Sequence, residues 1–469
     1  MIKRRTILHI GFIFPSSEYL HDPFRGDPHT HFHILTLLEH YFGDQIKSSL
    51  IDLRGIKRSF ALYHIPECDV YLHSAYTLDY SEQTSIIQEL RKRYPQAKHI
   101  AGGPHATSFQ EESLTVFDSI IIGDGEKSII QAIKDVHNQK LKQKYIASAV
   151  ENINEHPFPL RKYLPEATIS RPGLMTLKHK PGYDKILGTT VMFSRGCPYK
   201  CAFCEMPLSK QYSPGIRYRA PKLIEEEINY LKKEYKIEGI SLLDEICLPL
   251  TERKAIPHLE AIGRTGIVWR GQCRVDGITK NLTSLAKESG CITMCMGVES
   301  VSQQSLNIIN KGIKVERARK SIALLKNAGI ETRIYLIIGL PGEPENIVEQ
   351  TWDFIQETMP DSVYLSLFTI RPGTDVYENP EKYGIKSIKS DWDNTMHMHS
   401  RYDKESPVLT FEYEEQTPWG KTLSSEKIVD SYLELQNRLK ANGLGPVGYT
   451  DTENVESKDA TISKTTALV

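Results

Sequence analysis

Short apolar runs alternate with amphipathic segments over the first 145 residues of the chain. The apolar runs, which are typical of buried strands, are residues 6–14, 46–53, 69–74, 99–101 and 119–122, and the segments with a helical period are 28–42, 81–94 and 126–137. Near-continuous apolar strands separated by helices indicate a parallel sheet with helices on both faces. The pattern therefore predicts an α/β fold whose first domain, residues 1–145, is doubly wound and Rossmann-like, with its ligand site at the carboxyl ends of the strands.

The same alternation resumes at residue 188 and continues to residue 375. Strands are predicted at 189–194, 239–243, 267–269, 292–299, 332–339 and 362–369, and helices at 222–236, 282–289, 315–328 and 347–358. Six such units span roughly 180 residues, whereas an eight-unit barrel needs about 250. We therefore expect a partial (β/α)6 barrel of the TIM type over residues 188–375.

Three further segments lack this alternation. Residues 146–187 are rich in Pro and polar groups, which predicts a linker between the two domains. Residues 376–444 are predicted to form a small helical C-terminal region. Residues 445–469 are rich in Thr, Ser, Asp and Lys and contain one aromatic residue, so we expect a disordered tail.

Composition and charge exclude several classes of partner. The 58 Lys and Arg residues balance 59 Asp and Glu residues, so the chain offers no electrostatic attraction to nucleic acid or to an anionic membrane. No apolar run approaches the ~20 residues that a membrane helix needs. Basic residues precede the first apolar run, but this run contains His9 and lacks a small-residue cleavage site. We therefore interpret it as a strand rather than a signal peptide and expect a cytoplasmic protein.

Three of the eight cysteines form the strongest chemical motif, Cys197-Pro-Tyr-Lys-Cys201-Ala-Phe-Cys204, just after the first strand of the predicted barrel. Thiolates bind iron–sulfur clusters and zinc. A structural zinc site needs four ligands, whereas a [4Fe–4S] cluster held by three cysteines leaves one iron open for a further ligand. Active sites of barrel folds also lie at strand ends. The motif therefore favours a cluster over a zinc knuckle or three unrelated thiols.

With these residues the chain resembles the radical S-adenosylmethionine (SAM) superfamily over roughly residues 188–375. The resemblance implies that Cys197, Cys201 and Cys204 hold a [4Fe–4S] cluster whose open iron binds the amino and carboxylate groups of SAM. It also implies that one electron, from a reductase, a flavodoxin or a ferredoxin, cleaves SAM to methionine and a 5′-deoxyadenosyl radical. This radical abstracts a hydrogen atom from a small-molecule substrate.

The same resemblance implies a set of SAM contacts at the strands of the barrel. Glu299 ends the fourth strand, where its carboxylate is expected to bind the SAM ammonium group. Arg333 lies within an apolar strand and needs a partner, which is either SAM or a structural carboxylate. The full expected set is Phe203, Asp244, Arg274, Glu299, Arg333 and Gly339.

Several of these roles have alternatives. Asp244, followed by Glu245, resembles an acidic pair of relatives, but a charge at a helix N-terminus is the other interpretation. Gly339 begins a turn that resembles the adenine-contacting turn of the superfamily, and glycine there lets the backbone approach a ligand. Arg274 contacts SAM, the substrate, or neither. Cys291 and Cys295 share one face of a strand, and we interpret them as buried small hydrophobic residues rather than as ligands of a second cluster.

The N-terminal domain resembles the cobalamin-binding domain that precedes the barrel in one branch of the superfamily. The resemblance rests on residues that follow the third, fourth and fifth strands, where a doubly wound sheet binds its ligand. The expected cobalamin contacts are Ser74, Tyr76, Thr77, Gly102, Gly103, Gly123 and Glu126. The alternative is that these are turn residues at strand ends.

Two patterns of related proteins are not matched. Some cobalamin domains carry D-x-H-x-x-G with a cobalt-ligating histidine, but the nearest string here is Asp27-Pro-His29-Thr-His31-Phe32, with Phe in place of Gly. We therefore assign no cobalt ligand to His29. Methylthiotransferases place three extra cysteines in this domain, whereas this chain has only Cys68 before the motif.

The two resemblances together imply a cobalamin-dependent radical SAM enzyme that methylates an unactivated carbon of a small molecule. The alternatives are a non-methylating rearrangement or cyclisation by the same architecture, an N-terminal domain that recognises substrate or a partner without cobalamin, and a non-enzymatic zinc protein. No catalytic side chain and no substrate can be named from the sequence. Charged and aromatic residues between 391 and 413 either line a substrate pocket or form a surface helix and loop.

Overall fold

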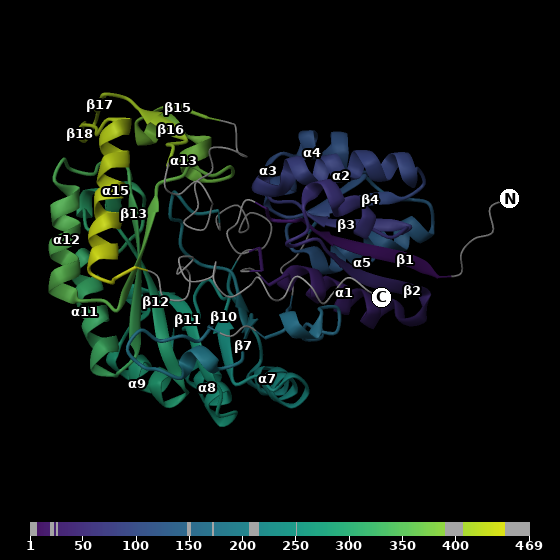
Figure 1. Ribbon diagram of the computed structural model, residues 1–469, viewed down its shortest axis with the longest axis horizontal. Helices are drawn as coiled ribbons and strands as arrows, with labels where there is room; N and C mark the ends of the chain where they lie inside the picture. Colours follow the sequence, from purple (N-terminus) through teal and green to yellow (C-terminus); the bar gives the residue numbers. More distant parts are fainter. Residues whose placement is uncertain are drawn as a thin grey trace, which may run out of the picture.

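The computed structural model describes residues 7–18, 23–24, 27–147, 152–170, 173–205, 215–249, 251–389 and 407–445. They form two lobes, an N-terminal α/β lobe in purple and blue and a larger half-barrel in teal and green (Figure 1). The predicted tail after residue 445 and most of the segment 391–413 lie outside the described residues. Among the described residues, every helix is too short or too polar to span a lipid bilayer.

The N-terminal lobe is built on one parallel sheet. Its strands are β1 (Leu8–Phe14), β2 (Ile46–Asp52), β3 (Val70–Ser74), β4 (Lys98–Gly102), β5 (Ser119–Ile122) and β6 (Lys144–Ile146). They pair in the order β2-β1-β3-β4-β5-β6, so the strand order reverses between β1 and β3. A doubly wound sheet binds its ligands at such a reversal. The predicted fold of this domain is confirmed, and β6 is a short addition to it.

Helices cover both faces of this sheet, as the alternating pattern predicted. They are α1 (His29–Phe42), α2 (Tyr80–Arg93), α3 (Pro104–Ser108), α4 (Gln110–Val116) and α5 (Gly125–His137). Leu35 and Leu38 of α1 and Ile133 of α5 join the core on one face of the sheet, while Ile86 and Leu90 of α2 join the core on the other. The two short helices α3 and α4 were not predicted, because neither is long enough to show a helical period.

The second lobe is a half-barrel of parallel strands with helices on its convex face. The strands are β7 (Gly188–Val191), β10 (Gly239–Leu242), β11 (Val268–Arg274), β12 (Cys291–Glu299), β13 (Glu331–Ile338) and β14 (Ser362–Leu367). They pair in sequence order from β7 to β14. The helices are α7 (Pro221–Tyr235), α8 (Glu252–Arg264), α9 (Lys280–Glu288), α10 (Gln303–Ile308), α11 (Val315–Asn327) and α12 (Ile347–Thr358). The predicted partial (β/α)6 barrel is confirmed.

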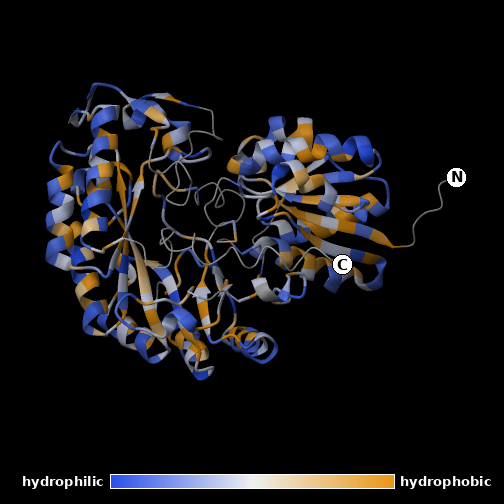
Figure 2. Cartoon of the chain, viewed as in Figure 1, coloured by the Kyte–Doolittle hydropathy of each residue, from blue (hydrophilic) through white to orange (hydrophobic). Residues whose placement is uncertain are grey.

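The two faces of the half-barrel sheet differ in character. Met294, Met296 and Val298 of β12 are fully buried and pack with helix residues in one large apolar core. Their neighbours Thr293 and Cys295 face the concave side. Figure 2 shows the apolar strands in orange and the outer helix faces in blue. The strand β11 was predicted too short because Arg270, Gln272 and Arg274 interrupt its apolar run while facing this concave side.

The predicted linker lies beneath the half-barrel. Met175 is fully buried under β7 and β10, where a Cβ atom on Gly239 would lie 2.6 Å from its Cγ. Arg161 of the same linker donates a hydrogen bond to the Thr190 carbonyl oxygen (2.7 Å) and pairs with buried Glu227 of α7 (3.3 Å). The linker therefore closes the end of the half-barrel at which the strands begin.

The C-terminal region is helical only in part. It contains α13 (Asp375–Glu378), an antiparallel pair β15 (Ile385–Ile388) and β16 (Phe411–Tyr413), a second pair β17 (Gln416–Thr417) and β18 (Gly420–Lys421), and α15 (Ser425–Ala441). The helix α15 packs beside α12 and β14 (Figure 1). The prediction of an all-helical region missed the four strands because each has only two to four residues. The described chain also has short 3₁₀ helices at Gly43–Gln45, Arg58–His64, Thr77–Asp79, Glu166–Thr168, Tyr183–Lys185, Val275–Gly277 and Pro380–Tyr383.

Candidate functional site

The three-cysteine motif lies on a loop at the carboxyl end of the half-barrel strands. A short strand β8 (Ser194–Arg195), paired with β9 (Arg217–Tyr218), leads into it. Cys201 is buried, and Cys197 and Cys204 are half-buried. Gly196 adopts φ +95°, and a Cβ atom there would overlap the Gly215 carbonyl oxygen. Only glycine fits this turn, which directs the chain into the cysteine loop.

Asp244 and Glu245, which follow β10, form hydrogen bonds with the residues that precede the cysteine loop in the sequence. The Asp244 carboxylate accepts hydrogen bonds from the Phe193 amide (3.1 Å) and the Ser194 hydroxyl. Glu245 accepts one from the Gly196 amide (3.1 Å). Burial raises the pKa of Asp244 to about 7. Asp244, a predicted SAM contact, is therefore placed where it fixes the loop that carries the cysteines.

The donor set fits a cluster better than a single ion. Within the described part of the chain, no group of three or more His, Cys, Asp or Glu side chains could hold one metal ion. A structural zinc site needs four donors that converge on one point, whereas the thiolates of an iron–sulfur cluster bind different irons. Arg274 lies 3.6 Å from the Cys201 sulfur through Nη1, and its guanidinium stacks 3.5 Å from the Tyr199 ring. The motif thus has a guanidinium beside one of its three sulfur atoms.

Glu299 meets the cysteine loop at the end of β12. Its carboxylate is 8% exposed and accepts a hydrogen bond from the Lys311 ammonium (2.6 Å). A Cβ atom on Gly297 would overlap this ion pair, so a larger residue there would displace the two side chains. Lys311 also lies 5.9 Å from the ring of Phe203, which stands between Cys201 and Cys204. The carboxylate thus already binds an ammonium group beside the cysteine loop, which is the chemistry expected of a SAM contact.

Gly339 begins the turn after β13 at the same edge. Its amide donates a hydrogen bond to the Glu343 carboxylate (2.8 Å), and its carbonyl accepts one from the Tyr413 hydroxyl (2.8 Å). Glu343 also contacts the Ser300 hydroxyl (3.5 Å), directly after Glu299. Burial raises the pKa of Glu343 to about 8. The turn predicted to contact adenine is therefore fixed next to the predicted ammonium contact.

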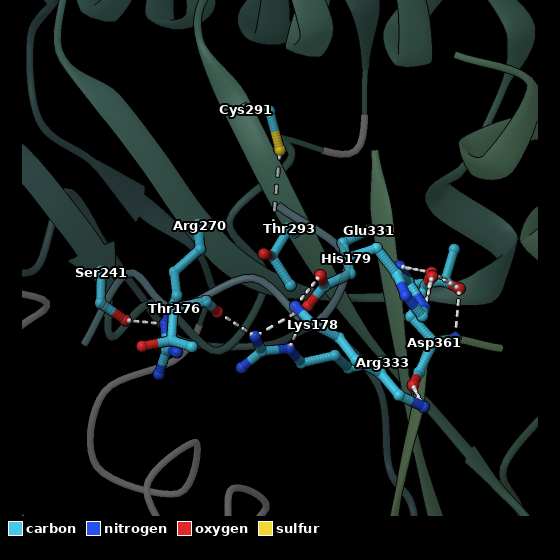
Figure 3. Close-up of polar contacts among 11 residues, drawn as sticks. Thr176, Lys178, His179, Ser241, Arg270, Cys291, Thr293, Glu331, Arg333 and Asp361 are labelled. Carbon is cyan, nitrogen blue, oxygen red and sulfur yellow. Dashed lines mark hydrogen bonds and ion pairs between the residues drawn. The ribbon is translucent and has the colours of Figure 1, made fainter. Parts of the chain in front are cut away.

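Arg333 lies near the beginning of β13, and Figure 3 shows its contacts with Glu331 and Thr176. Its guanidinium donates to Glu331 from Nε (3.1 Å) and Nη2 (2.8 Å), and to the Thr176 carbonyl oxygen (2.7 Å). It is the third residue of β13, whereas the cysteine loop and Glu299 meet the last residues of the strands. The structure does not bring Arg333 to the other predicted SAM contacts, and its partners are those of a structural ion pair.

A cavity of about 1160 Å³, its open side included, lies between the two lobes. Six of the seven predicted cobalamin contacts line it, namely Ser74, Tyr76, Gly102, Gly103, Gly123 and Glu126. Thr77 does not line the cavity, and its hydroxyl lies 3.3 Å from Nδ1 of His105 instead. His29, to which no role was assigned, also faces the cavity. The glycines lie at the ends of β4 and β5, where a bulky ligand can approach the backbone.

The opposite wall of this cavity belongs to the half-barrel. Gly196, the residue before Cys197, lines it together with Arg195, Arg217 and Glu245. From the N-terminal lobe, Tyr76 lines the same cavity, and 49% of its surface is accessible there. The cavity therefore joins the predicted cobalamin contacts to the cysteine loop.

Ion pairs tie the lobes together at the edge of the cavity. Glu126 of α5 binds Arg195, and Nε2 of His33 lies 3.1 Å from the same carboxylate. Asp124 binds Arg217. Burial opposes ionisation of Glu126, but Arg195 and His33 outweigh it and hold its pKa well below the usual range. Sequence reasoning found Glu126 but missed Arg195, Arg217 and Lys311, although Arg195 stands two residues before the motif.

Comparisons with known proteins agree with this geometry. Residues 191–355 match the model of the Radical SAM superfamily. An uncharacterized methyltransferase of Pyrococcus horikoshii is 31% identical over 60% of this chain and 62% of its own length. The anaerobic magnesium-protoporphyrin IX monomethyl ester cyclase of Rubrivivax gelatinosus is 31% identical over 40% of this chain and 34% of its own. The chain thus spans less than two thirds of the length of each of these two relatives.

Other relatives and solved structures match over more of the chain. The bacteriochlorophyllide d C-8(2)-methyltransferase of Chlorobaculum tepidum is 24% identical over 76% of both chains. The radical SAM methyltransferase TsrM from Kitasatospora setae superposes with a TM-score of 0.62 at 15% identity, covering 82% of this chain and 78% of its own. The cobalamin-dependent enzyme OxsB superposes with a TM-score of 0.65 at 15% identity, covering 93% and 67%. Residues 191–355 therefore match the Radical SAM superfamily, and the half-barrel and the three-cysteine loop found in this region agree with that match.

Proposed function

We propose that this protein is a cobalamin-dependent radical SAM methyltransferase that acts on a carbon atom of a small molecule. One observation carries the proposal. The cavity between the lobes has Gly102, Gly103 and Gly123 on one wall and Gly196, the neighbour of Cys197, on the other. A methyl donor bound by the first wall would therefore face a radical generated at the second.

Each part of the site has a distinct task in this proposal. Cys197, Cys201 and Cys204 would hold the [4Fe–4S] cluster, and Glu299 would bind the ammonium group of SAM. The cluster and SAM supply a 5′-deoxyadenosyl radical when bound, and cobalamin supplies a methyl group. Lys311 must release one oxygen of Glu299 or share the carboxylate with the incoming ammonium. An external one-electron donor, such as a flavodoxin, a ferredoxin or a reductase, would serve the cluster.

The ion pairs between the lobes support this division of labour. Arg195 and Arg217 flank the cysteine loop and bind Glu126 and Asp124 of the N-terminal lobe. They would fix the spacing of the two walls of the cavity, so that groups bound on the walls keep their relative position.

The relatives that are named as cyclases favour a second candidate, a non-methylating reaction by the same architecture. The two candidates differ in the fate of the SAM methyl group. A methyltransferase moves this methyl group to cobalamin and releases S-adenosylhomocysteine, whereas a cyclase releases 5′-deoxyadenosine alone.

The experiment is anaerobic reconstitution with iron, sulfide and hydroxocobalamin, followed by incubation with a reductant and SAM that carries a radiolabelled methyl group. Label retained on protein-bound cobalamin, with S-adenosylhomocysteine in solution, is the expected result and needs no known substrate. Bound cobalamin without label transfer, together with 5′-deoxyadenosine, would favour the non-methylating candidate. Zinc without iron or sulfide would overturn both.

A further inference from the structure

Charged side chains stand on the concave face of the half-barrel below the SAM edge. Arg270 of β11 pairs in register with Thr293 of β12, and Thr293 pairs with Glu331 of β13. Residues paired in a parallel sheet share a face, so Arg270 and Glu331 lie on the same side. Arg333 follows Glu331 by two residues and shares this face as well. Figure 3 shows Arg270 and Arg333 extending from their strands into this space.

Glu331, the acidic residue on this face, already forms an ion pair with Arg333. Glu331 accepts two of the three hydrogen bonds that the Arg333 guanidinium donates, both through Oε1. Its Oε2 accepts one from the Lys178 backbone amide (2.8 Å), so the linker occupies that side. Glu331 therefore neutralises Arg333, and it forms no ion pair with Arg270.

Arg270 has no charged partner in the described part of the chain. Its Nε donates a hydrogen bond to the Ser241 hydroxyl (3.1 Å), which fixes the direction of the side chain. Neither Nη atom meets a hydrogen-bond acceptor among the described residues. By contrast, Arg274, two residues further along β11, binds the Asp276 carboxylate and the Lys311 carbonyl oxygen.

The neighbours of Arg270 are polar but uncharged. Arg270 lies near enough to Tyr335 of β13 to oppose the burial that raises the pKa of that hydroxyl. Gln272, two residues along β11, and Tyr335 are both only half-buried, although they stand in the middle of their strands. Half-buried side chains on the concave face show that open space adjoins it below the cysteine loop.

A half-buried guanidinium has lost part of its solvation, and among the described residues Arg270 regains only the hydrogen bond to Ser241. Its two coplanar Nη atoms meet no acceptor of the described residues, and their geometry matches the two oxygens of a carboxylate. A monoanion would balance the one positive charge that the described residues leave without a counter-ion. Resting on the proposed function, we propose that Arg270 binds a carboxylate group of the substrate on the concave face of the half-barrel. The remainder of the substrate then extends toward the strand ends where Glu299 and Cys201 lie.

The test uses a matched pair of small probes, because the substrate is not identified. Benzoate and benzamide have the same shape, but only benzoate carries a carboxylate. Isothermal titration of the reconstituted protein is expected to show benzoate binding at least tenfold more tightly than benzamide. Arg270→Gln is expected to lose this preference, and Arg253→Gln, which changes an exposed arginine of α8, is expected to keep it. Equal binding of both probes to the wild-type protein, or an unchanged preference in Arg270→Gln, would overturn the proposal.

A second measurement distinguishes a binding role from a structural one. Because Arg270 has no charged partner among the residues that the structure describes, Arg270→Met is expected to keep or raise the melting temperature of the ligand-free protein, by up to about 2–4 °C. A fall of that size would show that Arg270 stabilises the fold and would overturn the proposal. Label transfer by the wild-type protein in the same preparation tests the proposed function separately from either result.

Discussion

Glu126 of the N-terminal lobe forms an ion pair with Arg195 of the half-barrel, across the boundary between the lobes. Arg195 stands two residues before Cys197 in the sequence. Glu126 is 2% exposed and also meets His33, so three elements far apart in the sequence meet at one carboxylate. The wall of the cavity that holds the predicted cobalamin contacts is thereby fastened to the loop that holds the cysteines.

Glu126→Gln is expected to lower the free energy of unfolding by about 1–3 kcal/mol at pH 7, because Arg195 and His33 lose a buried anionic partner. The low pKa of Glu126 means that its stabilisation is present above the unfolded-state value near 4.5 and is lost as the pH falls through the folded-state value. Urea denaturation at pH 7 measures the difference. Glu112→Gln, an exposed acid of α4, is the control, and equal losses in both variants would contradict the prediction.

Asp244→Asn is expected to change how stability depends on pH. Burial raises the pKa of Asp244 to about 7, so the folded protein keeps a proton that the unfolded chain releases near pH 4. Stability from this group is greatest below about pH 4 and falls as the pH rises toward 7. The amide cannot release a proton, so the variant should gain stability relative to the wild type over that range. Parallel urea-denaturation profiles, as expected for the exposed control Asp353→Asn, would argue against it.

Cys201→Ala is expected to abolish retention of iron and sulfide after anaerobic reconstitution, while cobalamin binding persists because its predicted contacts belong to the other lobe. Iron analysis and the visible spectrum report the two cofactors separately. Cys291→Ala removes a buried thiol where β12 begins and should retain both. Full iron content in Cys201→Ala would refute the assignment of the cluster ligands.

Substitutions of the neighbouring glycines Gly102 and Gly103 are expected to have different effects, because the first would fill the cavity and the second would strain the backbone. A Cβ atom on Gly102 meets nothing closer than 3.8 Å, so Gly102→Leu should fold and block cobalamin binding by occupying the cavity. Gly103 has φ +102°, and its Cβ atom would lie 2.8 Å from the Ala75 carbonyl oxygen. Gly103→Ala should therefore lower the melting temperature instead. Unchanged cobalamin binding by Gly102→Leu, measured by equilibrium dialysis, would place the cofactor elsewhere.

The sequence predicted those parts of the fold that have a strong period. The buried strand β5 was predicted with its observed bounds, because every residue in it is apolar or small. The helix α8 was missed because Pro257 stands in its interior and breaks the helical signal. The strand β11 was shortened because polar residues that face the concave side resemble a loop.

The site was predictable where its residues are close in the sequence. Three cysteines within eight residues form a recognisable sequence motif. By contrast, Arg195 lies 69 positions from its partner Glu126 and Arg217 lies 93 positions from its partner Asp124, so no motif indicates these ion pairs. Arg333 was foreseen as buried and partnered, but an arginine in an apolar strand does not reveal which end of the barrel it occupies. Only the register of β13 places it beside Glu331 at the end where the strands begin.

The path of the linker under the strands has a consequence for dividing the protein into parts. Met175 seals the half-barrel from below before the chain enters β7 at Gly188. A fragment that started at Gly188 would uncover the apolar underside of β7 and β10 and leave Arg333 without the Thr176 carbonyl oxygen. A fragment that contains the half-barrel alone therefore has to begin upstream of Gly173. The linker segment from Gly173 to Gly188 is structurally a part of the half-barrel that follows it.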